Sequence, residues 1–418
     1  RKTLLRAVDR VYHRGVRIAL GAYRTSPIHS LYCAAGLLPP HRRREVRSLQ
    51  YFVRMVATPR HRINQDLDPV MVALNRPQPL VARVTRHNRN LDVPNPPVLP
   101  RLPPQRGAWL RPSVEVRLDL ADFKKENTTM TEYNVRLNEI LASYPRSRIY
   151  YTDGSKGERG VGCSVYSRGE TRSWTLPPQA SVYTAELTAM RKAVQLHVTN
   201  GNVCDVLICT DSLSASHAVC NRLTDDPAVT AIYELVSEVH SGGHSVTFVW
   251  VPGHCGIVGN EKADVGAKSA AILPPPVEPE PVRWEDTKSA VRGIIWSKWQ
   301  EEWDTIRSKL RQVKPRVLGS THEDSLSRKE NVQLLRLRIG HTRLTQAYLL
   351  LGRPQPLCDH CDVPLTVIHL LEECPHLDGH RVHNDLVNIN LEDLLSRGSA
   401  SLGKVMQFLR DAGLFFQI

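Results

Sequence analysis

The chain has 418 residues and a formal charge of +13, with 41% hydrophobic and 23% charged residues, which leaves room for two to four compact units. No apolar run reaches 18 residues and the first residues lack the apolar core of a signal peptide, so the sequence supports neither a membrane span nor a secretory route. Nine scattered cysteines exclude a disulfide-based fold and favour a reducing, intracellular compartment.

The excess positive charge lies in the first quarter of the chain. Residues 1–100 hold 18 Lys and Arg against 5 Asp and Glu, whereas the remaining residues hold 37 of each kind. Residues 41–47 form one basic block, and a periodic basic set precedes it, Arg6, Arg10, Arg14 and Arg17. This pattern fits a surface that follows a phosphate backbone, and a solvated helix face is the alternative.

Residues 1–92 are expected to form a basic helical segment. Apolar residues recur at helical spacing from Leu4 to Ala19, the pattern ends near Gly21, and a second helical pattern covers residues 43–56. Because the chain starts without Met and directly with a helical pattern, we expect a fragment of a longer protein.

Proline marks two joints in the chain. Residues 93–104 and 273–281 cannot sustain a helix or a central strand, and they favour extended spacers. We therefore expect five segments: a helical segment at 1–92, a Pro-rich linker and connector at 93–145, an α/β domain at 146–272, a Pro-rich linker at 273–283 and a helical C-terminal module at 284–418.

The α/β domain shows a regular alternation of strand and helix patterns. The expected strands are 149–153, 162–166, 171–176, 203–210 and 246–251, and the expected helices follow Tyr183 to Gly201, residues 213–221, residues 228–240 and the stretch from Asn260. Three strands of a meander followed by strands that alternate with helices predict a mixed five-stranded sheet with flanking helices.

Four acidic residues stand at unusual places in this domain. Asp153 ends the first strand pattern and Asp211 follows the apolar one, whereas Glu186 and Asp264 lie within helix patterns. If the strands pair side by side, these carboxylates converge on one crevice. Carboxylates at close range repel one another unless divalent cations such as Mg²⁺ neutralise them. One acid alone is commonly a turn residue or a helix cap, so the prediction depends on the joint occurrence of all four.

Four sequence blocks of the domain resemble ribonuclease H type 1. They are residues 151–155 (Tyr-Thr-Asp-Gly-Ser), 184–187 (Thr-Ala-Glu-Leu), 209–212 (Cys-Thr-Asp-Ser) and 251–264 (from Val-Pro-Gly-His to Ala-Asp). The gaps of 33, 25 and 53 residues between successive acids suit the family, and His254 precedes Asp264 by ten residues. The resemblance implies a ribonuclease H-like fold for residues 146–272.

The same resemblance implies a chemistry. Asp153, Glu186, Asp211 and Asp264 would hold two Mg²⁺ ions, with Mn²⁺ as an alternative, and His254 would assist proton transfer or product release. The implied substrate is an RNA–DNA hybrid whose RNA strand is cut by water, and its 2′-hydroxyls distinguish RNA from DNA. A histidine beside glycine is otherwise most often a loop residue.

A second set of candidate ligands lies near the C-terminus. Cys358, Cys361, His369 and Cys374 have the spacing Cys-x2-Cys-x7-His-x4-Cys. Three thiolates and one imidazole complete a closed tetrahedral shell, so we expect a structural Zn²⁺ site that supports folding. The alternatives are ordinary thiols, or ligation by the other histidines nearby, His360, His376 and His380.

Two flanking stretches resemble non-LTR retrotransposon polyproteins of the Jockey-like kind. Residues 334–344, together with the Cys/His pattern, resemble their C-terminal module, and residues 19–40 resemble the region that follows the polymerase palm. Leu365 departs from the acidic residue often found at that position. The resemblance implies contacts of the basic segment and the Cys/His module with element RNA or DNA, no membrane, and a cytoplasmic or nuclear location.

Other patterns limit the functions that the sequence supports. The sequence has no aromatic-Ala-Asp-Asp polymerase motif, so we expect no polymerase activity. The helical spacing of Trp296, Trp299 and Trp303 favours a packing stripe over a base-stacking platform. The rival to a nuclease is a nucleic-acid-binding or assembly module whose nuclease is vestigial, and the four intact acids argue against it.

Overall fold

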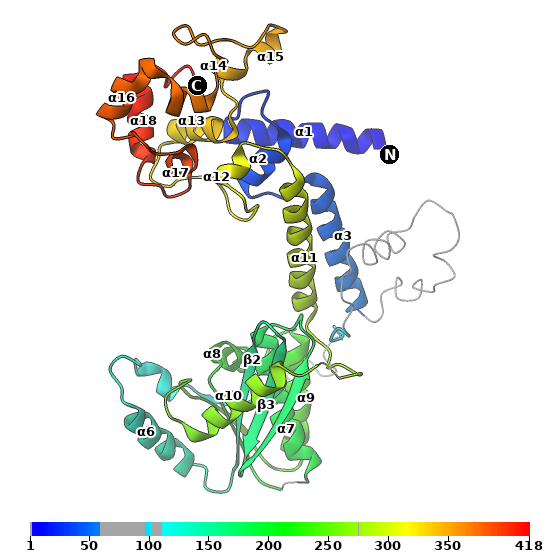
Figure 1. Ribbon diagram of the computed structural model, residues 1–418. Helices are drawn as coiled ribbons and strands as arrows, with labels where there is room; N and C mark the ends of the chain where they lie inside the picture. The colour runs from blue at the N-terminus through cyan, green and yellow to red at the C-terminus, as the bar shows by residue number, and fades with distance from the viewer. Residues whose placement is uncertain (1, 59–96, 102–110, 202, 275) are drawn as a thin grey trace. The chain divides into compact units, whose positions relative to one another are not determined.

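The computed structural model describes residues 2–58, 97–101, 111–201, 203–274 and 276–418 (Figure 1). The chain divides into two compact units, one of residues 1–47 with 293–418 and one of residues 48–292. Parts of the expected segments 1–92 and 93–145 lie outside the described residues, and the five-segment division stays a prediction. Among the described residues, no helix combines the length and apolar character needed to cross a membrane.

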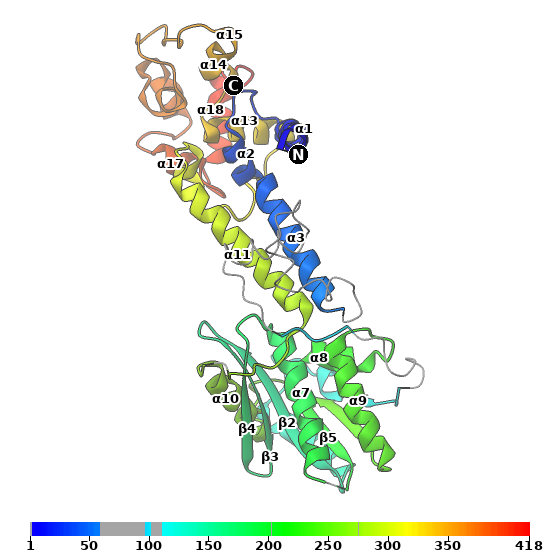
Figure 2. The ribbon, with the colours of Figure 1, turned by 90° about the vertical axis from the view of Figure 1, so that its right-hand side faces the viewer.

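The second unit is built on a single mixed sheet. Its strands are β1 (Glu115–Arg117), β2 (Arg148–Lys156), β3 (Val161–Ser167), β4 (Glu170–Leu176), β5 (Val206–Thr210) and β6 (Val246–Trp250), in the order β1-β6-β5-β2-β3-β4. β1, β6, β5 and β2 pair in parallel, whereas β3 and β4 add an antiparallel meander (Figure 2). The mixed α/β sheet was predicted, with five strands.

The sixth strand, β1, corrects that number. Only three residues form it, and they pair with residues Thr247 to Val249 of β6. A three-residue run shows no alternation that a sequence pattern can reveal. Two other boundaries differ. β2 continues to Lys156, so that Asp153 lies within the strand, and β5 starts at Val206, where its pairing with β2 and β6 begins, whereas Val203 is 82% exposed.

Helices cover both faces of the sheet. They are α6 (Met130–Ala142), α7 (Val182–Thr199), α8 (Leu213–Cys220), α9 (Pro227–Ser241) and α10 (Val258–Ala271), with a 3₁₀ turn at Asp119–Asp122. On one face, Tyr150 packs in a core with residues of α7, α8 and α9. On the other, Cys209 and Val249 pack with residues of α6. Adjacent residues of each strand thus serve opposite cores, as the alternation of side chains requires.

Helix α10 approaches the meander very closely. A Cβ added at Gly162 of β3 would lie 2.4 Å from the carbonyl oxygen of Ala267, and the Ser164 hydroxyl donates to the carbonyl of Ala263 at 2.5 Å. Small residues along α10 make this contact distance possible. The helix that carries Asp264 is therefore held tightly against the strand that lies next to Asp153.

The first unit is helical. It contains α1 (Lys2–Leu20), α2 (Ile28–Ala35), parts of α3 (Pro40–Val56) and α11 (Trp284–Thr305), and then α12 (Leu310–Val313), α13 (Arg328–Ile339), α14 (Arg343–Gln346), α15 (Tyr348–Leu351), α16 (Asp378–His383), α17 (Leu391–Leu395) and α18 (Leu402–Asp411). Trp299 and Trp303 are fully buried with Leu31 and Tyr32 of α2. The predicted packing role of the tryptophans is confirmed.

The second linker, predicted at residues 273–283, is not a free spacer at its end. Val282 is fully buried in a core with Ala185 and Ala189 of α7. Its backbone N–H donates to the carbonyl of Pro97 at 2.9 Å, and its carbonyl accepts from Leu99 at 2.8 Å. Val282 supplies a backbone N–H donor, which proline lacks, and a buried apolar side chain. Composition alone does not reveal this packing.

Candidate active site and metal centres

Two of the predicted acids follow a parallel strand pair. Thr152 of β2 lies opposite Thr210 of β5, the last residue pair of this ladder. Asp153 and Asp211 come directly after it, so both carboxylates emerge where the two strands diverge. The Thr152 hydroxyl donates to the carbonyl of Cys209 at 3.3 Å and ties the strands together at this point.

The third acid, Glu186, reaches the same place from α7. Ser181 caps this helix by accepting a hydrogen bond from the N–H of Thr184 at 3.2 Å. The next residue after Asp153 is Gly154, and a Cβ there would lie 2.6 Å from the backbone nitrogen of Glu186. Only glycine lets the strand come this close to the helix, so Gly154 decides how near Glu186 lies to Asp153.

Three of the four acids that were predicted to converge, Asp153, Glu186 and Asp211, form one group. One carboxylate oxygen from each lies within 4.8 Å of those of the other two. Burial, followed by the neighbouring carboxylates, raises the pKa of Asp153 to about 7. The same two causes raise the pKa of Glu186 well above its ordinary value, and burial raises the pKa of Asp211.

One buried oxygen in this cluster points to a cation. Glu186 is 5% exposed, and its Oε2 atom has no hydrogen-bond partner among the described residues. A buried carboxylate oxygen without a partner is costly unless a positive charge reaches it. Three oxygen ligands and a negative potential suit Mg²⁺ or Mn²⁺, so the residues present fit the predicted divalent cations.

The fourth acid, Asp264, lies in a neighbouring group. Its carboxylate, the His254 ring and the Glu261 carboxylate offer ligand atoms within 4.8 Å of one another. Asp264 is still close enough for its charge to raise the pKa of Asp153. Glu261 was not predicted as a site residue, although its position three residues before Asp264 on α10 places both on one helix face.

His254 stands on an exposed loop beside this group. It has a positive φ of 57°, which a non-glycine residue rarely adopts. Its neighbour Gly253 lies against Asp211, since a Cβ at Gly253 would be 2.4 Å from Asp211 Oδ2. Burial raises the pKa of Asp211, and the nearby His254, when protonated, opposes part of that rise.

Asn260 is a further residue at the site that sequence reasoning did not single out. Its side-chain nitrogen donates to Asp211 Oδ2 at 3.3 Å, and the residue is 2% exposed. The bond fixes the rotamer of Asp211 from the first turn of α10. Asn260 lies within the block of residues 251–264 that resembles ribonuclease H, and this position was the signal that could have identified it.

The four predicted zinc ligands also converge. Ligand atoms of Cys358, Cys361, His369 and Cys374 lie within 4.8 Å of one another, with sulfur–sulfur distances of 3.9 Å from Cys358 to Cys374 and 3.7 Å from Cys361 to Cys374. Hydrogen bonds, the largest from the His360 backbone, lower the pKa of Cys358 to about 6, which favours its thiolate. His369 is 3% exposed, and its Nε2 atom is buried without a partner in the described part of the chain. This donor set fits Zn²⁺.

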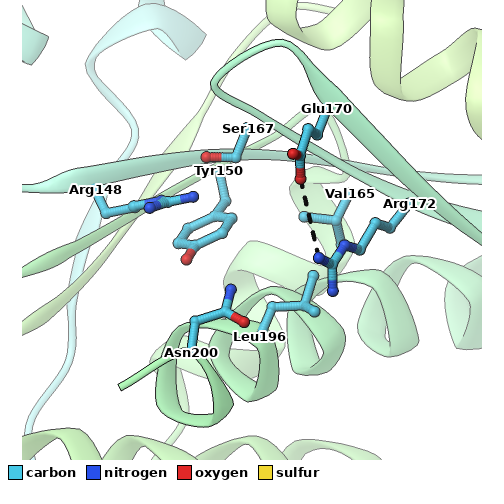
Figure 3. A pocket seen from close by; sticks show the side chains of 8 residues that line it. All are labelled: Arg148, Tyr150, Val165, Ser167, Glu170, Arg172, Leu196 and Asn200. Atoms are coloured by element: carbon cyan, nitrogen blue, oxygen red, sulfur yellow. Dashed lines mark ion pairs between the residues drawn. The ribbon is translucent and has the colours of Figure 1, made fainter. Parts of the chain in front are cut away.

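A separate small pocket lies away from the acids, near the start of β2 (Figure 3). Arg148, Ser167, Arg172 and Asn200 line it, and Glu170 pairs with Arg172 at 3.9 Å. Its volume of about 20 Å³ holds a water molecule rather than a substrate. None of the predicted site residues lines it, so it has no part in the chemistry considered above.

Comparison with known proteins gives a family for the part of the chain that carries the four acids. Residues 145–272 match the RNase H family. A segment of 131 residues is 33% identical to the Pol polyprotein of Equine infectious anemia virus, in isolates 1369 and CL22 and in strain Wyoming. The match covers 31% of this chain and 11% of each viral polyprotein. Residues 145–272 are thus a domain of the RNase H family, and the similarity of this part of the chain to the retroviral polyproteins is distant.

Proposed function

We propose that this chain hydrolyses the RNA strand of RNA–DNA hybrids at the cluster of Asp153, Glu186 and Asp211, as part of a retroelement polyprotein. The convergence of these three carboxylates within 4.8 Å, with the unpartnered Glu186 oxygen among them, is the observation that carries the proposal. Such a cluster is destabilising without bound cations, and groups held at a cost to stability are typical of functional sites.

Each residue has a role in this proposal. Asp153, Glu186, Asp211 and Asp264 would hold two divalent cations, Mg²⁺ or Mn²⁺, which when bound supply an activated water and charge stabilisation at the leaving oxygen. Asn260 orients Asp211 through the bond to Oδ2. His254, exposed on its loop, would carry a proton at the ring nitrogen toward or away from the leaving group.

The flanking parts extend the proposal. Cys358, Cys361, His369 and Cys374 would hold a structural Zn²⁺ ion. The basic α1 would contact phosphate groups of element RNA or DNA, and the similarities of residues 19–40 and 334–344 favour a Jockey-like non-LTR element acting in the cytoplasm or at chromatin. The polyprotein context has support from the viral relatives, whose matched part is a small fraction of their length.

A cleavage assay tests the central proposal. The whole chain is incubated with a hybrid labelled on the RNA strand and with Mg²⁺ or Mn²⁺, next to single-stranded RNA, duplex DNA and the variant Asp211→Asn. We expect cleavage of the hybrid RNA alone and its loss in the variant. If the wild-type chain cuts nothing with either metal, the rival explanation of a vestigial nuclease in a binding or assembly module replaces this one. If Asp211→Asn cuts as well as the wild type, the cleavage does not take place at this cluster and the proposed site is wrong.

A further inference from the structure

The structure assigns a positioning role to residues 280–286, which lie beyond the ribonuclease H match. We propose that this segment, here called the strap, holds α7 so that Glu186 stays in register with Asp153, and that Asp286 is its main positioning residue. The inference rests on the proposed function because it concerns the same carboxylate cluster. It concerns residues of one compact unit only.

The strap contacts α7 along three turns. At the C-terminal side, the Glu280 carboxylate lies 2.6 Å from the guanidinium of Arg191 and also pairs with Lys192. In the middle, Val282 is fully buried with Ala185 and Ala189. Ion pairs at one end and apolar packing next to Glu186 together prevent α7 from sliding along the sheet.

Arg283 extends the contact to the neighbouring helix. Its guanidinium lies 2.8 Å from Asp226, the N-cap residue of α9, and 4.9 Å from the ring centroid of Tyr183 at the start of α7. The strap thus joins the N-termini of α7 and α9 through one side chain. The pair is largely shielded from solvent, with side chains 15% and 14% exposed, so water and salt screen it less than a surface ion pair.

Asp286 contacts the first turn of α7, which leads to Glu186. Its Oδ2 atom accepts a hydrogen bond from the Thr184 hydroxyl at 2.5 Å, and that hydroxyl accepts from the hydroxyl of the cap residue Ser181 at 3.2 Å. Asp286 is 5% exposed and Thr184 is 1% exposed. A buried carboxylate at a helix N-terminus is also favoured by the helix dipole.

Thr184 and Glu186 belong to the same helical turn, which explains how the strap acts on the site. Gly154 touches the backbone of Ala185 and Glu186 from the strand side, and Asp286 holds Thr184 from the opposite segment of the chain. The first turn of α7 is therefore clamped between β2 and the strap. Without the contact to the strap, Glu186 could move relative to Asp153. Such a movement of one metal ligand lowers metal affinity and turnover.

The test uses the whole chain with Asp286→Asn and Thr184→Val, next to two controls. Thr184→Ser keeps the hydroxyl, and Glu278→Gln makes the same charge change at an exposed position just before the strap. We expect both test variants to lower kcat about tenfold and to raise the Mg²⁺ concentration at half-maximal rate, with the KM for the hybrid changed less than twofold. The double variant should match either single one, because both remove the same bond.

A second measurement separates this inference from the proposed function. Magnesium ions raise the Tm of the wild-type chain if the acids bind them, and this rise should shrink in Asp286→Asn and Thr184→Val but persist in the controls. A wild-type chain that binds Mg²⁺ without cutting the hybrid would contradict the proposed function alone. The strap inference is overturned if the test variants lose Tm in the absence of metal but keep the wild-type Mg²⁺ response and kcat, since the strap would then serve stability only.

Discussion

The ammonium group of Lys268 lies 2.7 Å from Oδ2 of Asp264, one helical turn earlier on α10. The lysine side chain is 57% exposed, whereas that of Asp264 is 14% exposed. The positive charge of Lys268 also lowers the pKa of Asp153, against the effects of burial and the other acids. Lys268 therefore supplies part of the positive charge that the acid cluster needs, and it competes with divalent cations for Asp264.

Replacing Lys268 by Met should make Mg²⁺ binding easier. We expect the Mg²⁺ concentration at half-maximal cleavage to fall about two- to fivefold, the range of one exposed ion pair. The control is Lys262→Met, which removes an exposed charge from the same helix. Metal titrations of the three proteins at one ionic strength give the comparison, and equal shifts in both variants would mean that only net charge matters.

The raised pKa of Asp153 predicts how the stability of the metal-free chain depends on pH. Its carboxyl group binds a proton up to about pH 7 in the folded state but only to about 3.8 when unfolded. The stabilising effect of that proton is therefore complete below the unfolded value, and it is lost as the pH rises through about 7. With EDTA present, Asp153→Asn should gain Tm relative to wild type as the pH goes from 5 to 8.

Added Mg²⁺ should reverse the Tm difference at high pH, so that the wild-type chain becomes more stable than Asp153→Asn. Because the cations bind the ionised carboxylates, they raise the wild-type Tm more at pH 8 than at pH 5. A Tm difference between Asp153→Asn and wild type that stays constant over this pH range in EDTA would refute the assignment of Asp153 as a carboxyl group with a raised pKa.

Gly154 offers a test of the close approach between β2 and α7. In Gly154→Ala the new methyl group would meet the nitrogen of Glu186 at 2.6 Å, so the strand and the helix must separate. We expect a loss of about 1–3 kcal/mol in the free energy of unfolding, as for overpacked cores, and a larger loss of cleavage than stability alone explains. Gly157→Ala is the matched control, because no atom of the described residues lies within 4 Å of a Cβ there. Urea unfolding of both variants decides the matter.

The acid cluster was predictable because it depends on local patterns. An apolar run that ends in Asp211 and a helix stripe around Glu186 are visible in the sequence, and parallel pairing brings such residues together. Asp153 was predicted to end its strand, but β2 continues to Lys156, and it is the pairing with β5 that ends just before Asp153. The same holds for the cysteine cluster, whose ligand spacing lies within 17 residues of the chain.

Other features depend on contacts that no local pattern reveals. The hydrogen bond from Thr184 to Asp286 spans 102 residues, and Glu280 meets Arg191 across 89. Composition presented residues 273–283, which include the first part of the strap, as a spacer, because proline disfavours helix and strand but does not exclude packing. Strand β1 was missed because it has only three residues. The pairing of Arg42, in the basic block 41–47, with Glu302 at 2.5 Å likewise joins distant parts of the sequence.

The cysteine cluster predicts one bound zinc ion per chain. Cys358 and Cys374 lie in the core of the C-terminal helices with Leu370 and Phe408. Cys358→Ser should therefore lose one equivalent of zinc and about 4 kcal/mol or more of stability, as when other structural metals are lost. Cys220→Ser, at an exposed cysteine of α8, should keep both, and so should His376→Ala if His369 is the fourth ligand. Elemental analysis and thermal unfolding provide the readouts, and a metal-free, equally stable wild-type chain would exclude the site.

The phosphate role of the basic segment needs point variants rather than a deletion. Leu31 and Tyr32 pack against Trp299 and Trp303, so removing the first residues would open this core. Arg42 and Arg44 are engaged with Glu45 and Asp9, each at 2.7 Å, whereas three arginines of α1 are exposed, Arg6, Arg10 and Arg14.

Changing these three exposed arginines to Gln should lower the salt dependence of nucleic-acid binding while leaving the core intact. If each contacts a phosphate of a duplex, the slope of log K against log salt should fall by about 2–3, since each contact contributes about 0.9. The control changes Lys329, Arg353 and Arg397, which are exposed but scattered over the same unit, and so removes the same net charge. Equal slopes for both triple variants would show that α1 acts only through overall charge, and an unchanged slope would remove its phosphate role altogether.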